Sequence, residues 1–239
     1  MVQNMKKDSQ LFRLIVGLLI TVTVFAVSLY ISRVVRFNSD FIPSSFSTDV
    51  LMLLLSVALI LVMRKQVNYR IALPSFKSTL RPILFGFLSA VVINITIGLL
   101  AVALSGSIDT RPNDVHPVVA RESVLQFVLF TLVLASVAEE FLFRGFFQNY
   151  LSPLKTKGFS LFRRRISLPV FIGALTFGLA HLILLSSGVG VFFVVRIVLF
   201  TFTLGLIAGY YQEKYDNHAY AIIVHMSGNL MGVIGIMMM

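Results

Sequence analysis

The sequence contains no cysteine and no tryptophan, and it has few charged residues for its length. Without cysteine, the chain can form no disulfide, no thiolate metal site and no cysteine nucleophile. Without tryptophan, any aromatic belt at a membrane interface must consist of tyrosine and phenylalanine. Only 13% of the 239 residues are charged and 57% are hydrophobic, whereas a soluble domain is about 25% charged and about 45–50% apolar. This apolar excess is too large for one core, and we expect lipid to solvate much of it.

Acidic residues are also scarce: 10 of them stand against 20 lysines and arginines, for a net charge of +10. In a soluble protein this excess would suggest a nucleic-acid partner. Here the bases lie in short loops between apolar runs, a pattern that membrane orientation explains, so we expect no nucleic acid to bind. No polar stretch is long enough to fold alone. We therefore predict a single integral membrane domain over residues 1–239.

Seven apolar runs are long enough, or nearly so, to cross a bilayer as helices of about 20 residues. They are residues 11–32, 48–63, 83–106, 123–150, 168–186, 191–211 and 219–238, of which the second is short by this criterion. The fold class that we predict is all-α, a polytopic transmembrane bundle of about seven spanning helices in the cell membrane.

The loops between these runs alternate in charge. Bases gather in the N-terminal segment and in the second and fourth loops, whereas the third loop is mixed and the fifth turn carries no charge. Basic loops remain cytoplasmic, so this alternation predicts a cytoplasmic N-terminus. Arg33 and Arg36 are the one discordant pair. In the fourth loop, residues 158–165 mix three aromatic or aliphatic side chains with three arginines. They could lie in the headgroup plane as an interfacial turn or form a plain cytoplasmic loop.

Two adjacent carboxylates, Glu139 and Glu140, interrupt the fourth apolar run. A charged side chain inside a membrane costs about 2.5–3.5 kcal/mol on insertion scales, so each needs a reason to be there. Glu140 and Arg144 have the i,i+4 spacing and order of an intrahelical ion pair, which would leave Glu139 for a separate role. The alternative is that both acids merely pair with bases such as Arg144 and Arg196.

Polar residues also interrupt the fifth and seventh runs. His181 lies in the fifth, and His225 and Asn229 lie in the seventh with the i,i+4 spacing that places them on one helix face. An imidazole and an amide on one face could stabilise an oxyanion, or they could simply join helices. On the predicted topology Glu139 and the two histidines all fall in the cytoplasmic half of the bilayer.

The remaining features have simpler interpretations. His116 and His218 lie in loops, and we expect both to be exposed to solvent. Gly205 and Gly209 form a Gly-x-x-x-Gly pair, which predicts close helix packing.

The ordered set Glu139-Glu140-x-x-x-Arg144, Phe177-x-x-x-His181 and His225-x-x-x-Asn229 resembles the CPBP family. These are the CAAX-processing and bacteriocin-processing intramembrane proteases, also called the Abi or type II CAAX prenyl endopeptidase family. The resemblance covers residues 120–235, as the catalytic core, and leaves residues 1–119 as additional transmembrane helices. It implies an intramembrane endopeptidase that cuts near the cytoplasmic side, acting on a prenylated CAAX-like tail, a leader or pheromone peptide, or a membrane protein.

The resemblance also implies residue roles. Glu139 would be the general base, His181 would orient water, His225 and Asn229 would form an oxyanion hole, and Glu140 and Arg144 would support the site. If a metal such as zinc were present, its ligands would be Glu139, His181 and His225, but we favour metal-free activation of water. Two other functions stay open. Intramembrane charges also mark proton-coupled transporters, although no inverted repeat is evident. A non-catalytic peptide-binding adaptor is the third alternative.

Overall fold

A computed structural model describes residues 2–35, 37, 39–105 and 123–238 of the chain. Within these residues the fold is all-α apart from one small hairpin, and it is a polytopic membrane bundle, as predicted. Six helical segments are long and apolar enough to cross a membrane, and a seventh, α2, is an apolar helix of 17 residues. The third-loop residues that made that loop mixed in charge (Asp109, Arg111, Asp114, Arg121 and Glu122), together with His116, lie outside the described residues.

The first three helices are α1 (Val2–Val34), α2 (Phe46–Val62) and α3 (Phe76–Ser105). The fourth span is one helical rod made of α4 (Val124–Gln126), the π-helical η2 (Phe127–Ala135), α5 (Ser136–Glu140) and the π-helical η3 (Phe141–Gln148). A 3-10 turn, η4 (Ser152–Leu154), and strands β1 (Gly158–Leu161) and β2 (Arg164–Ser167) follow it. The chain ends with α6 (Leu168–Ala180), the 3-10 helix η5 (His181–Ser187), α7 (Val191–Tyr215) and α8 (Ala219–Met237).

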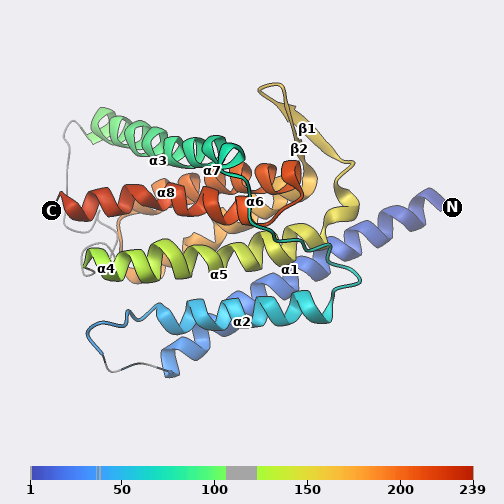
Figure 1. Ribbon diagram of the computed structural model, residues 1–239, viewed down its shortest axis with the longest axis horizontal. Helices are drawn as coiled ribbons and strands as arrows, with labels where there is room; N and C mark the ends of the chain where they lie inside the picture. Colours follow the sequence, from blue (N-terminus) through green and yellow to red (C-terminus); the bar gives the residue numbers. More distant parts are fainter. Residues whose placement is uncertain (1, 36, 38, 106–122, 239) are drawn as a thin grey trace.

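Successive spans alternate in direction (Figure 1). The N-terminus, the α2–α3 connection, the hairpin and the α7–α8 turn lie at one end of the bundle, and the C-terminus lies at the other. The basic loops therefore gather at a single end, as the alternation of loop charges requires. We call this the N-terminal end; its cytoplasmic location stays a prediction.

Several boundaries differ from those predicted. Helix α1 begins at Val2 and α3 at Phe76, because the helices continue through polar turns that lie outside their apolar runs. The fifth span changes from α-helix to 3-10 helix at His181. Residues 158–165, expected to be an interfacial turn or a plain loop, belong to an antiparallel hairpin of residues 158–167.

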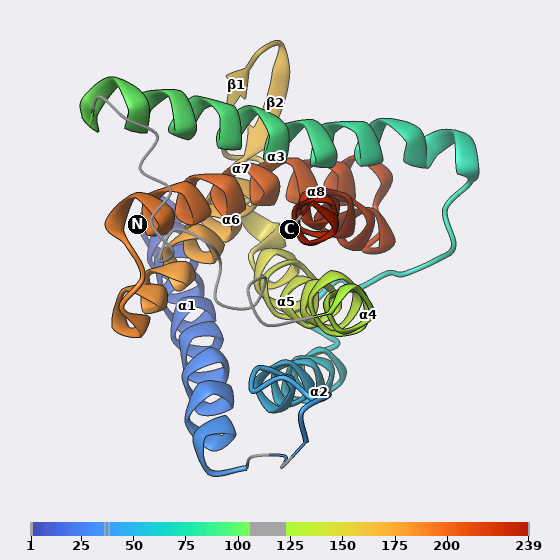
Figure 2. The ribbon, with the colours of Figure 1, turned by 90° about the vertical axis from the view of Figure 1, so that its left-hand side faces the viewer.

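The fourth span lies at the centre of the bundle, between α2 and α8 (Figure 2). Its η3 segment buries four large side chains, Leu142, Phe143, Phe146 and Phe147, against α1, α2 and α6. A second apolar cluster joins α7 and α8, and α3 packs on it through Phe85. The central span is therefore enclosed by protein, and that enclosure permits buried charge within a membrane bundle.

Candidate active site

The site begins at a change of helical geometry. The short α5 stretch carries Glu139 and Glu140 between two π-helical stretches. A π-helix bonds i to i+5, and such turns occur often at functional sites. The Glu140 side chain is fully buried, whereas that of Glu139 keeps 21% of its surface exposed. The two adjacent acids therefore occupy different environments, as their spacing predicted.

Glu140 is paired with Arg144. The Arg144 Nη1 donates to Glu140 Oε1 at 3.0 Å, and both side chains are completely buried. The Arg144 guanidinium also lies 4.3 Å from the centroid of the Phe177 ring, a cation–π contact with α6. A buried ion pair needs such additional contacts, because desolvation offsets much of the Coulomb attraction.

The glycine pair of α7 makes room for this arrangement. A side chain at Gly205 would collide with Arg144 Nη2, and a Cβ at Gly209 would lie 2.5 Å from Gln148 Oε1. The predicted close packing is present, since the same two positions contact α6 at Ala174 and Val170. The two glycines thus leave space for the side chains of Arg144 and Gln148 and also allow α6 to pack closely on α7.

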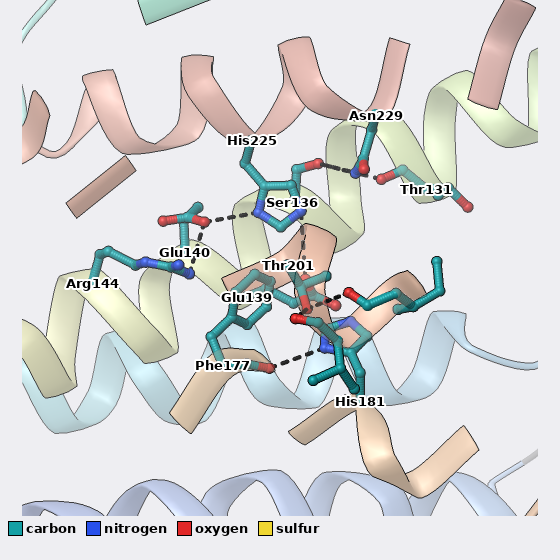
Figure 3. Close-up of polar contacts among 12 residues, drawn as sticks. Thr131, Ser136, Glu139, Glu140, Arg144, Phe177, His181, Thr201, His225 and Asn229 are labelled. Carbon is teal, nitrogen blue, oxygen red and sulfur yellow. Dashed lines mark hydrogen bonds and ion pairs between the residues drawn. The ribbon is translucent and has the colours of Figure 1, made fainter. Parts of the chain in front are cut away.

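His225 connects the two glutamates. Its Nδ1–H donates to Glu140 Oε1 at 2.8 Å, and its Nε2 lies 3.6 Å from Glu139 Oε2. Figure 3 shows the imidazole between the two carboxylates, with Arg144 beyond Glu140. A carboxylate on Nδ1 fixes the tautomer and the orientation of an imidazole. Glu140 is therefore shared by Arg144 and His225.

Asn229 contacts the same helix one turn away. Its amide nitrogen donates to Ser136 Oγ at 3.0 Å, and Ser136 in turn donates to Thr131 O at 3.4 Å. His225 and Asn229 therefore share a face of α8, as their spacing predicted, and meet Glu140 and Ser136 on the central span.

His181 approaches from α6. Its Nδ1–H donates to Phe177 O at 3.0 Å, and its ring packs edge-on against the Phe177 ring at 5.1 Å. The Phe177 ring also lies 5.5 Å from that of His225. Figure 3 shows the His181 ring directed into the cluster that contains Glu139 and Thr201. Phe177 is thus the aromatic contact shared by both histidines and Arg144.

The fit of a metal ion can be judged from the donor set. Within the described part of the chain, no three His, Cys, Asp or Glu side chains are placed to hold one ion. Glu139, His181 and His225, the conditional ligands, do not form such a group. The residues in this arrangement therefore do not fit a zinc site.

Sequence reasoning missed other polar residues. Ser136 gave no signal by itself, because buried serines are common in membrane helices. Asp49, in the first turn of α2, is buried and close enough for its charge to act on Glu139. Its position inside an apolar run was the signal that could have identified it.

The prediction for His218 was wrong. The residue is almost fully buried, its Nδ1–H donates to Gln212 Oε1 at 2.8 Å, and its ring packs against Tyr69 and Phe141. Burial lowers the pKa of His218 to about 4, so the ring is neutral at physiological pH. A loop that is short in sequence can lie inside the bundle where helix ends converge.

Fold and site together define a polytopic membrane protein with a carboxylate–imidazole cluster inside its helices. Comparison with family models matches residues 121–231 to the family described as Type II CAAX prenyl endopeptidase Rce1-like. This segment is a domain of that CPBP family, whose members are intramembrane peptidases. Neither a curated protein nor a solved structure matches the chain.

Proposed function

We propose that this peptidase is an endopeptidase that hydrolyses a peptide bond near the cytoplasmic side of the membrane, with water activated by Glu139. The observation that carries the proposal is the position of His225, which bonds Glu140 through one ring nitrogen and faces Glu139 through the other. The carboxylate of Glu139, as a base, and the imidazole of His225, as a proton donor, would thus face the same position of a bound substrate. The catalytic set comprises Glu139, His181, His225 and Asn229, with Glu140 and Arg144 as positioning residues.

Glu139 is the general base. Its partial exposure allows water to reach a carboxylate that is otherwise surrounded by protein. In the first step Oε2 takes a proton from water while the water oxygen attacks the scissile carbonyl carbon. In the second step the protonated Glu139 returns that proton to the leaving amine as the C–N bond breaks. A side chain in this role contributes about 10²–10⁴-fold to the rate.

His225 and Asn229 stabilise the oxyanion. With Nδ1–H held by Glu140, the His225 ring is oriented so that an N–H at Nε2 would point at the developing negative charge. The Asn229 amide has two N–H groups, and Ser136 accepts one of them, so the other can be donated to the substrate oxygen.

His181 orients the attacking water. Because its Nδ1–H is donated to the Phe177 carbonyl, the neutral ring has an acceptor at Nε2. An acceptor on the side of the cluster opposite His225 would fix one water proton and direct the other to Glu139.

The test is cleavage by the full-length protein reconstituted in vesicles, with products identified by mass spectrometry. Three probes separate the substrate classes: an S-farnesyl-cysteine C-terminal peptide, its unprenylated counterpart, and a single-span membrane peptide. We expect wild type to cut at least one probe, Glu139→Gln to lose cleavage, and Glu213→Gln to retain it. Glu213 is the matched control, because it is a partly buried carboxylate of α7 bonded to Ser167. Equal cleavage by wild type and Glu139→Gln would refute the assignment of the base.

A further inference from the structure

The β1–β2 hairpin has an unusual turn. Leu161 pairs with Arg164, which leaves Phe162 and Arg163 as a two-residue loop. Both loop residues have positive φ, at 46° and 63°. Two consecutive left-handed residues in such a loop match a type I′ turn, for which Asn-Gly is the favoured sequence because glycine tolerates positive φ.

The backbone conformation of this turn therefore disfavours the two side chains that the turn carries. Phenylalanine and arginine in the left-handed region cost free energy that Asn-Gly would avoid. Phe162 buries nothing in return, since 91% of its surface is exposed. A strained turn that displays an exposed aromatic ring beside an arginine indicates a role for these side chains outside the folded chain.

One face of the hairpin holds it to the bundle. Phe159 packs edge-on against Phe171 of α6, with ring centroids 5.5 Å apart. The guanidinium of Arg164 lies 5.0 Å from the Phe85 ring of α3 and 5.3 Å from the Tyr210 ring of α7. The strand pairing places Arg165 on the opposite face, across from Ser160. The tip and the outer face thus carry Phe162, Arg163 and Arg165.

The hairpin extends sideways from the bundle. Figure 1 shows it at the N-terminal end, rising past α3, and Figure 2 shows it projecting outward beyond the same helix. A hairpin that leaves one end of a membrane bundle sideways reaches over the lipid that surrounds the spans. Lipid headgroups are therefore the candidate surface for its tip and outer face.

The positive charge of the hairpin favours lipids with negatively charged headgroups. The sequence has no aspartate or glutamate between Glu140 and Glu213, and Glu213 meets the hairpin at its base, where it accepts a hydrogen bond from Ser167. We propose that the hairpin is a binding site for anionic phospholipid headgroups, in which Arg163 and Arg165 hold phosphate groups and Phe162 enters the interface between headgroups and acyl chains. Guanidinium groups suit phosphate because they offer paired donors. Lipid binding at the hairpin would not require peptidase activity.

The absence of tryptophan from the chain makes a direct test available. The variant Phe162→Trp places a single tryptophan at the tip of the full-length protein. The protein is reconstituted in phosphatidylcholine vesicles with increasing phosphatidylglycerol, and tryptophan emission is measured with a quencher attached to lipid near the headgroup. We expect a blue-shifted emission and stronger quenching as phosphatidylglycerol increases.

Charge variants in the Phe162→Trp background decide the role of the arginines. Arg163→Gln with Arg165→Gln should raise the half-saturating phosphatidylglycerol content roughly tenfold, because each base near an anionic surface contributes a several-fold factor. Arg163→Gln alone should give part of this effect while leaving the contact of Arg165 with Thr156 intact. Arg64→Gln with Lys65→Gln removes the same charge from exposed positions at the same end and should change nothing.

Two results would overturn the proposal. Emission typical of a ring in water in both kinds of vesicle would place the tip in the aqueous phase. An equal shift from the Arg64–Lys65 pair would mean that total charge, and not the hairpin, attracts the lipid.

Discussion

His225 Nδ1 lies 2.8 Å from Glu140 Oε1, so the imidazole of α8 is held by the buried carboxylate of the central span. Glu139, the adjacent acid, faces the other ring nitrogen at 3.6 Å. Of the two glutamates, Glu140 is fully buried and holds the histidine ring, whereas Glu139 keeps part of its surface exposed.

The first prediction concerns Glu140 and Arg144. Glu140→Leu should destabilise the protein by about 3–5 kcal/mol, because Arg144 would be left charged and buried without its partner. Glu140→Leu combined with Arg144→Met should recover much of that loss, since an apolar pair of similar volume needs no desolvation. Denaturant unfolding in detergent micelles measures both variants. A double variant no more stable than Glu140→Leu would contradict the pairing.

The second prediction tests the glycines of α7. Gly209→Ala should destabilise by about 1–3 kcal/mol, because its Cβ would lie 2.5 Å from Gln148 Oε1 and 3.2 Å from Val170 Cγ1. Gly98→Ala is the matched control within α3, where a Cβ meets nothing within 4 Å. The control should be neutral or slightly stabilising, since alanine favours helix over glycine. Comparable losses in both variants would show that helix propensity, and not close packing, is responsible.

These two predictions indicate which parts of the molecule the sequence could reveal. Contacts within one helix follow from the spacing of residues along it, and the i,i+4 spacing of Glu140 and Arg144 predicts their ion pair. The partner of His225 could not be read, because it depends on how α8 packs against the central span. The π-helical turns on both sides of Glu139 add to the difficulty, since the α-helical rotation per residue does not hold through them.

The same reasoning explains the other differences. The seven runs and their alternating loop charges predicted the bundle, because hydrophobicity and charge are properties of each segment alone. The burial of His218 could not be inferred, since it results from contacts with Tyr69 and Phe141 in other segments. The hairpin was missed because its turn lacks the asparagine and glycine that normally indicate one.

The third prediction is a dependence of stability on pH. The pKa of His218 is about 4 in the folded protein, below its ordinary value of 6.5, because burial disfavours the charged ring. Between these values the unfolded chain binds a proton that the folded protein does not, so stability falls as pH decreases from about 6.5 to about 4, by up to about 3 kcal/mol. Unfolding midpoints across this range should show the slope. His218→Gln should flatten it, and an unchanged slope would assign the effect to other groups.

The fourth prediction concerns Ser136 as a positioning residue. Ser136→Ala removes the acceptor that holds the Asn229 amide, so kcat should fall by about tenfold, less than the 10²–10³ that loss of a whole oxyanion donor costs. KM should change little, because the contact acts on the transition state. Ser56→Ala is the control, since that buried hydroxyl bonds only to Met52 O of its own helix among the contacts of the described residues. An equal fall of kcat in both variants would indicate a general effect on folding.

The most direct test of the central claim is whether Glu139 and His225 act as one unit. His225→Asn keeps an amide donor near Glu140 while removing the nitrogen that faces Glu139, and Glu139→Gln removes the base. Cleavage rates are measured for both single variants and for the double variant, each with an unfolding midpoint as a check on folding. If the two residues serve one step, the double variant will be no slower than the slower single variant. If the two losses multiply instead, the residues act independently, and Glu139 and His225 do not form one shared site.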